Sequence, residues 1–324
     1  MKTILISAPY MIPILNRFRP IFEHYRVELI VPEVHERMEA AELLPYAGLV
    51  DGAICGDDRY TAEVLQCFAP RLKVISKWGT GIDSLDRVAA ARLGIHIRNT
   101  PNAFTLPVAD TVMGYLLAFA RRQPWMDQMV KAGVWDKIPG RSLSECTLGV
   151  IGVGNIGKAV IRRARAFGMH ILATDIIPIA PDFILENGVA MTTLKDLMQR
   201  ADFISVNCDL NPTSYHLINA ESLRWCQPGA VVINSARGPL VDEAALVAAL
   251  QSGQIGGAAL DVFEEEPLPV DSPLCQLDNV MLAPHNANSS PSAWERVHWN
   301  TIRNLIEGLG FDPADVQKFQ NQGK

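Results

Sequence analysis

The stretch that decides the fold is Thr147-Leu-Gly-Val-Ile-Gly-Val-Gly-Asn-Ile-Gly157, where three glycines stand in GxGxxG spacing. An apolar run precedes the glycines, and a helical pattern follows them over 155–167. Such a strand–turn–helix unit needs Gly152 for a tight turn, Gly154 for the approach of a pyrophosphate, and the last glycine for close contact between helix and strand. The segment predicts a dinucleotide-binding site.

The helix after the glycines supplies the second part of this site. Asn155 and Ile156 open the helix, and its first N–H groups and positive dipole end favour phosphate. The next apolar run ends at Asp175, whose carboxylate can accept hydrogen bonds from the adenosine ribose and would repel a 2′-phosphate. The expected cofactor is therefore NAD rather than NADP. The alternative, ordinary turn glycines and a strand-capping Asp175, is disfavoured by this ordered context.

Strands and helices alternate on both sides of the glycine motif. The expected strands are 3–7, 27–31, 50–54, 73–76 and 95–98, then 147–151, 170–174, 203–207, 230–234, 257–263 and 280–283. The expected helices are 13–24, 36–46, 61–68, 84–92, 105–122, 155–167, 194–200, 219–225, 242–252 and 291–309. Alternation at this pitch predicts two doubly wound parallel sheets in an α/β protein. The polar tail from residue 311 is expected to be loosely held.

Composition limits the remaining classes. The chain has 324 residues, enough for two domains, and a formal net charge of −6 argues against nucleic acid or an anionic membrane as partner. No apolar run is long enough to span a bilayer, and Pro9 and Pro13 break the N-terminal run, so a first strand is expected there instead of a signal peptide. Six scattered cysteines without metal-ligand spacing favour reduced thiols, a cytoplasmic protein and no metal.

Polar residues follow three successive strands of the second series. Strand 230–234 leads to Arg237, strand 257–263 to the acidic run 264–266, and strand 280–283 to His285. Because parallel strands end at one edge of a sheet, these side chains should meet beside the cofactor. Taken singly, they would be a surface ion pair, a solvated acidic run and a capping histidine, but their joint placement favours a catalytic site.

This set of residues suits the reduction of a ketone. An arginine can bind a carboxylate through two hydrogen bonds and polarise the neighbouring carbonyl. A histidine can protonate the developing alkoxide, and a glutamate bonded to its ring favours the imidazolium and fixes its orientation.

At this point the chain resembles the D-isomer-specific 2-hydroxyacid dehydrogenase family, which includes phosphoglycerate, glycerate and D-lactate dehydrogenases. The resemblance extends over nearly the whole chain. Its motifs are SKWGTGIDSLD (76–86), NTPNAFTLPVAD (99–110), GVIGVGNIGKAV (149–160), VINSARGPLVDEAAL (232–246), ALDVFEEEPLP (259–269) and DNVMLAPH (278–285).

The resemblance implies a role for each matching residue. Arg237 corresponds to the substrate-binding arginine, Glu266 to the histidine's partner and His285 to the acid–base histidine. The loop from Lys77 to Gly81 matches the family's substrate-carboxylate loop, so its residues are expected to bind substrate: Lys77, Trp78, Gly79 and Thr80. Asp261 corresponds to the residue that binds the nicotinamide carboxamide. Other residues are expected to line the cofactor cleft: Thr213, Ser235 and Ala236.

The resemblance also implies an architecture. A Rossmann NAD-binding domain (101–286) would be inserted into a flavodoxin-like substrate domain (1–100 and 287–324), with the catalytic cleft between them. The implied activity is reversible hydride transfer between NAD(H) and C2 of a small 2-oxo or (R)-2-hydroxy acid, of the phosphoglycerate or the hydroxypyruvate/glyoxylate type. We expect a homodimer built on the nucleotide domain, with 121–146 as a crossing arm.

Two residues leave the substrate open. Phe104 replaces a family asparagine that can reach the substrate, and it is either a packing residue or an apolar part of the site. Lys77 either neutralises a second anionic group, such as a phosphate, or has no such role. The rival functions are a formate or phosphonate dehydrogenase on this scaffold, whose extra motifs we do not find, and an NAD-sensing, corepressor-like binding protein.

Overall fold

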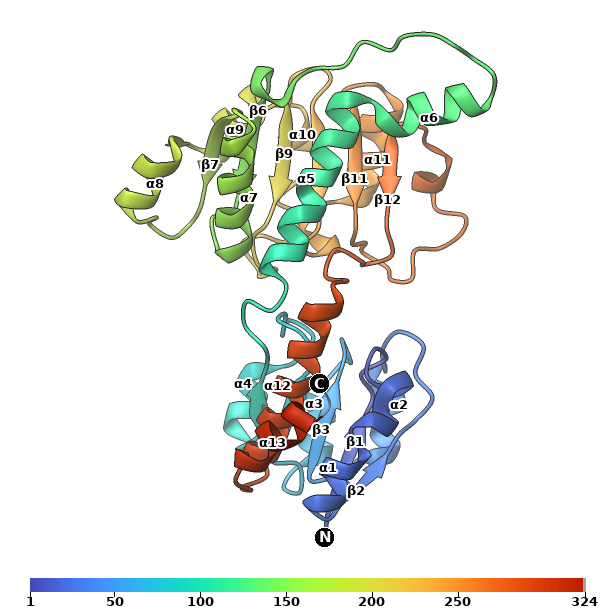
Figure 1. Ribbon diagram of the computed structural model, residues 1–324, viewed down its shortest axis with the longest axis vertical. Helices are drawn as coiled ribbons and strands as arrows, with labels where there is room; N and C mark the ends of the chain where they lie inside the picture. Colours follow the sequence, from blue (N-terminus) through green and yellow to red (C-terminus); the bar gives the residue numbers. More distant parts are fainter. Residues whose placement is uncertain (323–324) are drawn as a thin grey trace. The chain divides into compact units, whose positions relative to one another are not determined.

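The computed structural model describes residues 1–322 and divides into two compact units (Figure 1). Unit 1 comprises Met1–Phe104 and Ser290–Lys324, and unit 2 comprises Thr105–Ser289. The chain thus leaves unit 1 after residue 104, builds unit 2, and returns. The expected crossings, 100/101 and 286/287, lie four and three residues from the observed ones.

Unit 1 contains a five-stranded parallel sheet of order β2-β1-β3-β4-β5. Its strands are β1 (Lys2–Ile6), β2 (Val27–Ile30), β3 (Gly52–Cys55), β4 (Val74–Lys77) and β5 (His96–Arg98). Its helices are α1 (Arg19–His24), α2 (Ala40–Leu43), α3 (Ala62–Phe68), α4 (Arg87–Arg92), α12 (Pro291–Gly308) and α13 (Ala314–Gln322), with 3-10 turns at Ile12–Arg17 and Leu44–Tyr46. This strand order is that of flavodoxin-like folds.

Helix α12 returns to unit 1 and covers the sheet across β3, β4 and β5. The approach is close: a Cβ added to Gly308 would lie 2.4 Å from Val74 Cγ2, and one on Gly52 would lie 2.9 Å from Leu305 Cδ1. The Ser76 hydroxyl also donates to the carbonyl of Thr301 over 2.8 Å. Small residues on sheet and helix therefore fix where α12 lies.

Unit 2 contains a seven-stranded sheet of order β12-β11-β10-β9-β6-β7-β8, again with every pair parallel. Its strands are β6 (Thr147–Ile151), β7 (His170–Thr174), β8 (Val189–Met191), β9 (Phe203–Val206), β10 (Val231–Asn234), β11 (Gly257–Leu260) and β12 (Val280–Leu282). Counted from β6, the order is that of a Rossmann fold with one additional strand, and the order reverses between β6 and β9.

Helices cover both faces of this sheet. One core layer joins α5 (Thr105–Arg121), α7 (Asn155–Ala166) and α8 (Pro181–Asn187) to the strands, and the other joins α9 (Leu194–Arg200), α10 (Ala220–Leu223) and α11 (Glu243–Gln251). Figure 1 shows α5 and α7 in front of the strands. Helix α6 (Gln123–Lys131) and 3-10 turns at Leu143–Glu145, Gly238–Leu240 and Pro273–Gln276 complete the unit.

The prediction of two doubly wound parallel sheets is confirmed, and the differences are local. Helices α6 and α8 and strand β8 were not expected, and several expected elements are shorter than their apolar patterns. The expectation of a loosely held tail is wrong for residues 314–322, which form α13 beside α12 with Val316 fully buried. Within residues 1–322, no helix has the length and apolar character needed to cross a membrane.

The glycine turn offers a direct test of the packing in unit 2. A Cβ on Gly157 would lie 2.1 Å from the carbonyl oxygen of Gly152, whereas one on Gly154 would meet no atom within 4 Å. We expect Gly157→Ala to lower the free energy of unfolding by about 1–3 kcal/mol, because α7 must move away from the turn. Gly154→Ala is the matched control, with an expected change of no more than about 0.5 kcal/mol. Urea unfolding would measure both, and equal losses would contradict this account.

Candidate active site

The glycine turn lies at the carboxyl end of β6, where the strand order of unit 2 reverses. Gly152 has a φ of +88°, and a Cβ there would lie 2.6 Å from the backbone nitrogen of Cys208. The first glycine therefore lets the turn lie against the chain that follows β9. Open space beside Gly154, at the N-cap of α7, leaves room for a phosphate to approach the helix N-terminus.

A cavity of about 570 Å³, part of it open to solvent, lies beside this turn. It is lined by Ile151, Gly152, Thr174, Asp175, Ile176, Leu194, Cys208, Asn211, Thr213, Ser214 and Leu217. The Asp175 carboxylate accepts the N–H groups of Val153 (2.6 Å) and Ile177 (2.9 Å). Each of its oxygens can accept a further hydrogen bond, so Asp175 can both hold the turn and bind ribose hydroxyls.

Most of the cavity-lining residues in the loop after β9 were not predicted from the sequence. Thr213 was expected to line the cofactor cleft, and it lines this cavity. Four other lining residues of the loop were not expected: Cys208, Asn211, Ser214 and Leu217. No motif marks these positions, although a strand next to the switch point could have indicated them. Burial raises the pKa of the Cys208 thiol to about 11, so this wall of the cavity carries no thiolate at neutral pH.

An unsatisfied polar atom also lies in the segment after β10. The hydroxyl of Ser235 is buried and has no hydrogen-bond partner within residues 1–322. Buried hydroxyls normally have a partner, so an external group is expected to supply one. This atom, the open turn at Gly154 and the carboxylate of Asp175 together fit a dinucleotide.

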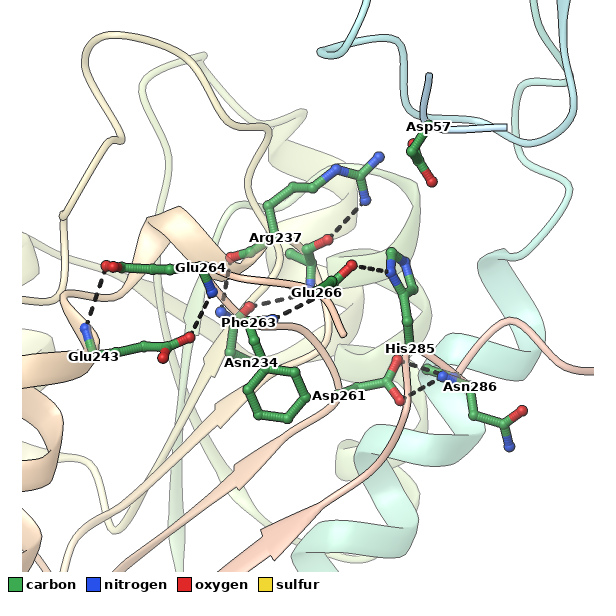
Figure 2. Close-up of polar contacts among 12 residues, drawn as sticks. Asp57, Asn234, Arg237, Glu243, Asp261, Phe263, Glu264, Glu266, His285 and Asn286 are labelled. Carbon is green, nitrogen blue, oxygen red and sulfur yellow. Dashed lines mark hydrogen bonds and ion pairs between the residues drawn. The ribbon is translucent and has the colours of Figure 1, made fainter. Parts of the chain in front are cut away.

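Arg237 lies in the same segment, which is locked to the loop after β11. Asn234 orders the turn: its side-chain amide donates to the carbonyl of Arg237 over 2.8 Å, and its carbonyl accepts the N–H of Ala236. A Cβ on Gly238 would lie 1.8 Å from the carbonyl oxygen of Phe263, so the two loops touch backbone to backbone. The Arg237 side chain is half-buried and emerges from this contact (Figure 2).

Glu266 and His285 form a hydrogen-bonded pair, as the sequence predicted. Glu266 Oε2 lies 3.0 Å from His285 Nδ1, while its Oε1 accepts the N–H of Phe263 over 2.9 Å. Both side chains are mostly buried, with exposed fractions of 18% for Glu266 and 23% for His285. Nδ1 is thus the ring nitrogen through which His285 contacts Glu266 (Figure 2).

The backbone at His285 is held in an unusual conformation. Its φ is +50°, in the left-handed region that non-glycine residues seldom occupy. Asp261 secures it, because its two carboxylate oxygens accept the N–H groups of Asn286 (2.7 Å) and Ala287 (2.9 Å). Burial raises the pKa of Asp261, and these two hydrogen bonds oppose the rise. Asp261 therefore orients His285, in addition to any contact with a cofactor.

In unit 1, Lys77 ends β4, and the loop after it contains Trp78, Gly79, Thr80 and Gly81. Gly79 has a φ of +125°. Within the described residues, the backbone N–H groups of Gly79, Thr80 and Gly81 donate to no protein acceptor. Three adjacent N–H groups of this kind suit the binding of a carboxylate.

The ammonium group of Lys77 is buried and already paired. Lys77 is 4% exposed, and its Nζ lies 3.2 Å from Asp57 Oδ1 and donates to the carbonyl of Trp78 over 3.0 Å. The Asp57 side chain is 39% exposed, so the cost of opening the pair falls mainly on the buried ammonium group, which would lose its partner. The positive charge of the loop is therefore balanced within unit 1.

Trp78 is the centre of an aromatic cluster. Its ring centroid lies 5.2–5.8 Å from those of Tyr10, Phe104, Trp294 and His298. The indole N–H donates to His298 Nδ1 over 2.9 Å, and burial lowers the pKa of His298 to about 4, which keeps that acceptor neutral. Phe104 packs on Trp78 and comes within 3.6 Å of a Cβ built on Gly79, so it is a packing residue that also borders the loop.

Comparisons with known proteins agree with this geometry. Residues 113–287 match the family described as "D-isomer specific 2-hydroxyacid dehydrogenase, NAD binding domain". The chain is 40% identical to the glyoxylate reductase of Korarchaeum cryptofilum over 77% of its own length and 76% of that protein. It is 44% identical to the D-3-phosphoglycerate dehydrogenase of Methanocaldococcus jannaschii over 72% of its length, but it covers only 45% of that protein.

A solved structure supports the same assignment. The D-lactate dehydrogenase of Aquifex aeolicus, complexed with NAD and lactic acid, is 26% identical and superimposes with a TM-score of 0.83 over 99% of this chain and 97% of its own. The predictions of family, fold, enzyme class and cofactor are confirmed. The chain belongs to the D-isomer-specific 2-hydroxyacid dehydrogenases and is an NAD-dependent oxidoreductase acting on CH–OH groups.

Proposed function

We propose that this dehydrogenase reduces a small unphosphorylated 2-oxo acid, such as glyoxylate or hydroxypyruvate, to the (R)-2-hydroxy acid. The observation that carries the proposal is the burial of Lys77 against Asp57. The cation nearest the carboxylate-binding loop is already neutralised, so it is not available for a phosphate. Glyoxylate reductases among the relatives that match over most of their length support the same substrate class.

Two groups are proposed to bind the substrate. Arg237 would bind the carboxylate and polarise the C2 carbonyl through its guanidinium. The N–H groups of Gly79, Thr80 and Gly81 would bind the carboxylate oxygens by hydrogen bonds. In this scheme Trp78 and Lys77 shape and support the loop, and unit 1 is the substrate-binding domain.

His285 is proposed to be the general acid. When bound, NADH supplies the hydride that reaches C2. His285 Nε2 donates its proton to the carbonyl oxygen as the alkoxide develops, and takes a proton back in the reverse reaction. Glu266, bonded to Nδ1, stabilises the imidazolium and keeps the ring in one orientation.

The cofactor is proposed to lie along the switch point of unit 2. Gly152, Gly154 and Gly157, with Asn155 and Ile156 at the start of α7, would receive the pyrophosphate. Other residues would complete the binding site: Asp175 and Thr213 at the adenosine, and Ser235, Ala236 and Asp261 toward the nicotinamide.

The enzyme is further proposed to work as a cytoplasmic homodimer. The six cysteines are unpaired thiols, which suits a reducing compartment. In the arm 121–146, Trp135 is 87% exposed, and Val130 and Val134 are 51% and 40% exposed. Large apolar side chains gathered on one exposed segment are typical of an interface.

Matched substrates test the proposed specificity. We expect hydroxypyruvate to give at least about a tenfold higher kcat/KM than 3-phosphohydroxypyruvate, because a phosphate would need a cation to pair with. NADH oxidation at 340 nm would be followed for these two acids, glyoxylate, pyruvate, 2-oxoglutarate and branched-chain acids. Arg237→Ala should abolish the activity with every acid. A preference for the phosphorylated acid would contradict the proposal, and NADH binding without turnover of any acid would favour a sensing role.

The proton donor is tested by His285→Gln. We expect the variant to bind NADH as the wild type does but to turn over about 10²–10⁴ times more slowly, since it loses general acid catalysis. Fluorescence titration would measure NADH affinity, and steady-state assays would measure turnover. His170→Gln, an exposed histidine at the start of β7, is the matched control. Unchanged turnover in His285→Gln would remove this residue from the mechanism.

The oligomeric state is tested by light scattering during size exclusion. We expect a mass close to twice the chain mass of 35.6 kDa at micromolar protein. Trp135→Glu should shift the population toward monomer, because it places a charge in an apolar contact. A wild-type monomer under these conditions would contradict the dimer.

A further inference from the structure

His216 stands in the loop after β9 and has no part in the function proposed above. The same loop lines the cofactor cavity through Asn211, Thr213, Ser214 and Leu217. The backbone of His216 is in the left-handed region, with φ of +48°, and the side-chain amide of Asn219 donates to its carbonyl over 2.9 Å. Backbone strain of this kind persists where surrounding contacts require it.

The contacts of His216 reach two catalytic segments. Its N–H donates to the carbonyl of Pro239 over 2.9 Å, two residues after Arg237. Its ring nitrogen Nε2 lies 2.7 Å from Glu264 Oε1, and the two side chains are 28% and 37% exposed. One residue thus connects the cofactor-lining loop to the segments that carry Arg237 and Glu266.

Glu264 is held from the other side by the N-terminus of α11. Its Oε1 accepts the N–H of Glu243, the first residue of that helix, over 3.3 Å. Its own N–H donates to Glu243 Oε1, which gives a reciprocal pair (Figure 2). A carboxylate is stabilised at a helix N-terminus, so Glu264 has a fixed anchor there.

The contacts of Glu264 affect the position of the neighbouring Glu266–His285 pair. Glu266, two residues after Glu264, folds back to accept the N–H of Phe263 and reaches His285 Nδ1 with its other oxygen. Residues 263–266 therefore form a short turn that is fastened at Glu264 and presents Glu266. The proposed function assigns neither Glu264 nor His216 a contact with substrate or cofactor.

The turn needs such a fastening because it concentrates negative charge. Glu243, Glu264, Glu265 and Glu266 lie close enough that burial, and then the neighbouring carboxylates, raise the pKa of Glu243. The other charged or titratable groups beside the turn are Arg237, Asp261 and His285. Without His216, mutual repulsion would favour opening of the turn and displacement of Glu266.

We propose that His216 and Glu264 are positioning residues whose side-chain contact, called the clasp below, holds the 263–266 turn in place. The turn then keeps Glu266 against His285, and the same contact connects this pair to the cofactor-lining loop. The inference rests on the proposed roles of Glu266 and His285. His216→Gln keeps an N–H near the position of Nε2, whereas His216→Ala and Glu264→Ala break the clasp.

The test is the pH profile of kcat/KM for reduction of the best 2-oxo acid. Reduction needs protonated His285, so activity falls as pH rises through the pKa of that group. In His216→Ala and Glu264→Ala we expect kcat to fall about tenfold and the alkaline limb to move down by about one pH unit, because a displaced Glu266 stabilises the imidazolium less. The double variant should lose no more than either single variant, since the two residues act as one contact. His216→Gln should recover most of the activity.

Glu265→Gln is the matched control, since it removes the same charge from the same turn outside the clasp. Its profile should stay within about 0.3 pH units of the wild type. Circular dichroism would show which variants fold, and His216→Ala carries the test if Glu264→Ala does not fold. An unchanged alkaline limb in the folded clasp variants, or the same shift in Glu265→Gln, would overturn the proposal. Full turnover in His285→Gln would instead contradict the proposed function itself, because the clasp is proposed to act through His285.

Discussion

The buried carboxylate of Asp261 holds the loop on which the catalytic geometry depends. It stands at the end of β11, 1% exposed, and accepts the N–H groups of Asn286 and Ala287. Those two hydrogen bonds offset the strain of the left-handed backbone at His285, a conformation worth roughly 1–3 kcal/mol in other proteins. Charge-assisted bonds inside a protein are stronger than neutral ones, so a single carboxylate can fix a loop that belongs to the neighbouring strand. The orientation of His285 toward Glu266 follows from this contact.

Glycines bring the remaining parts of unit 2 within reach of that loop. Gly238 lets the Arg237 segment touch the backbone of Phe263, and Gly152 lets the nucleotide turn touch the chain at Cys208. These contacts leave no space for a Cβ, so the loop after β10 touches the loop after β11, and the loop after β6 touches the loop after β9. Side chains on closely packed loops have little freedom to move, and catalytic groups require such fixed positions.

The sequence predicted those parts of the fold and site that depend on local pattern. The GxGxxG turn, the strand ends at Arg237, the acidic run 264–266 and His285, and the two parallel sheets all follow from short-range spacing, because parallel strands of one sheet end at one edge. The choice of Glu266 within that run came from the family resemblance. Helix α8 also had local signals that were overlooked, Pro181 at its start and a left-handed Gly188 at its end. Helix α13 was missed because its sequence is polar and its one fully buried side chain, Val316, gives no period.

Several contacts between distant residues were not predicted from the sequence. The Asp261 bonds span 25 and 26 residues, and the His216–Glu264 contact spans 48. The ion pair between Lys77 and Asp57 was likewise not predicted. From the sequence, Lys77 could neutralise a second anion or have no such role, and the position of Asp57 supports the second alternative.

That pairing has a consequence for how the enzyme recognises charge. With Lys77 and Asp57 forming a neutral pair, the loop after β4 offers N–H dipoles instead of a free cation. A phosphorylated acid carries an additional charge of about −1.5 to −2 that these groups leave uncompensated. Desolvating that charge without a partner would cost several kcal/mol. Under the proposed function, selectivity for a monoanionic 2-oxo acid arises from this ion pair, because the pair withdraws a cation that a larger anion would need.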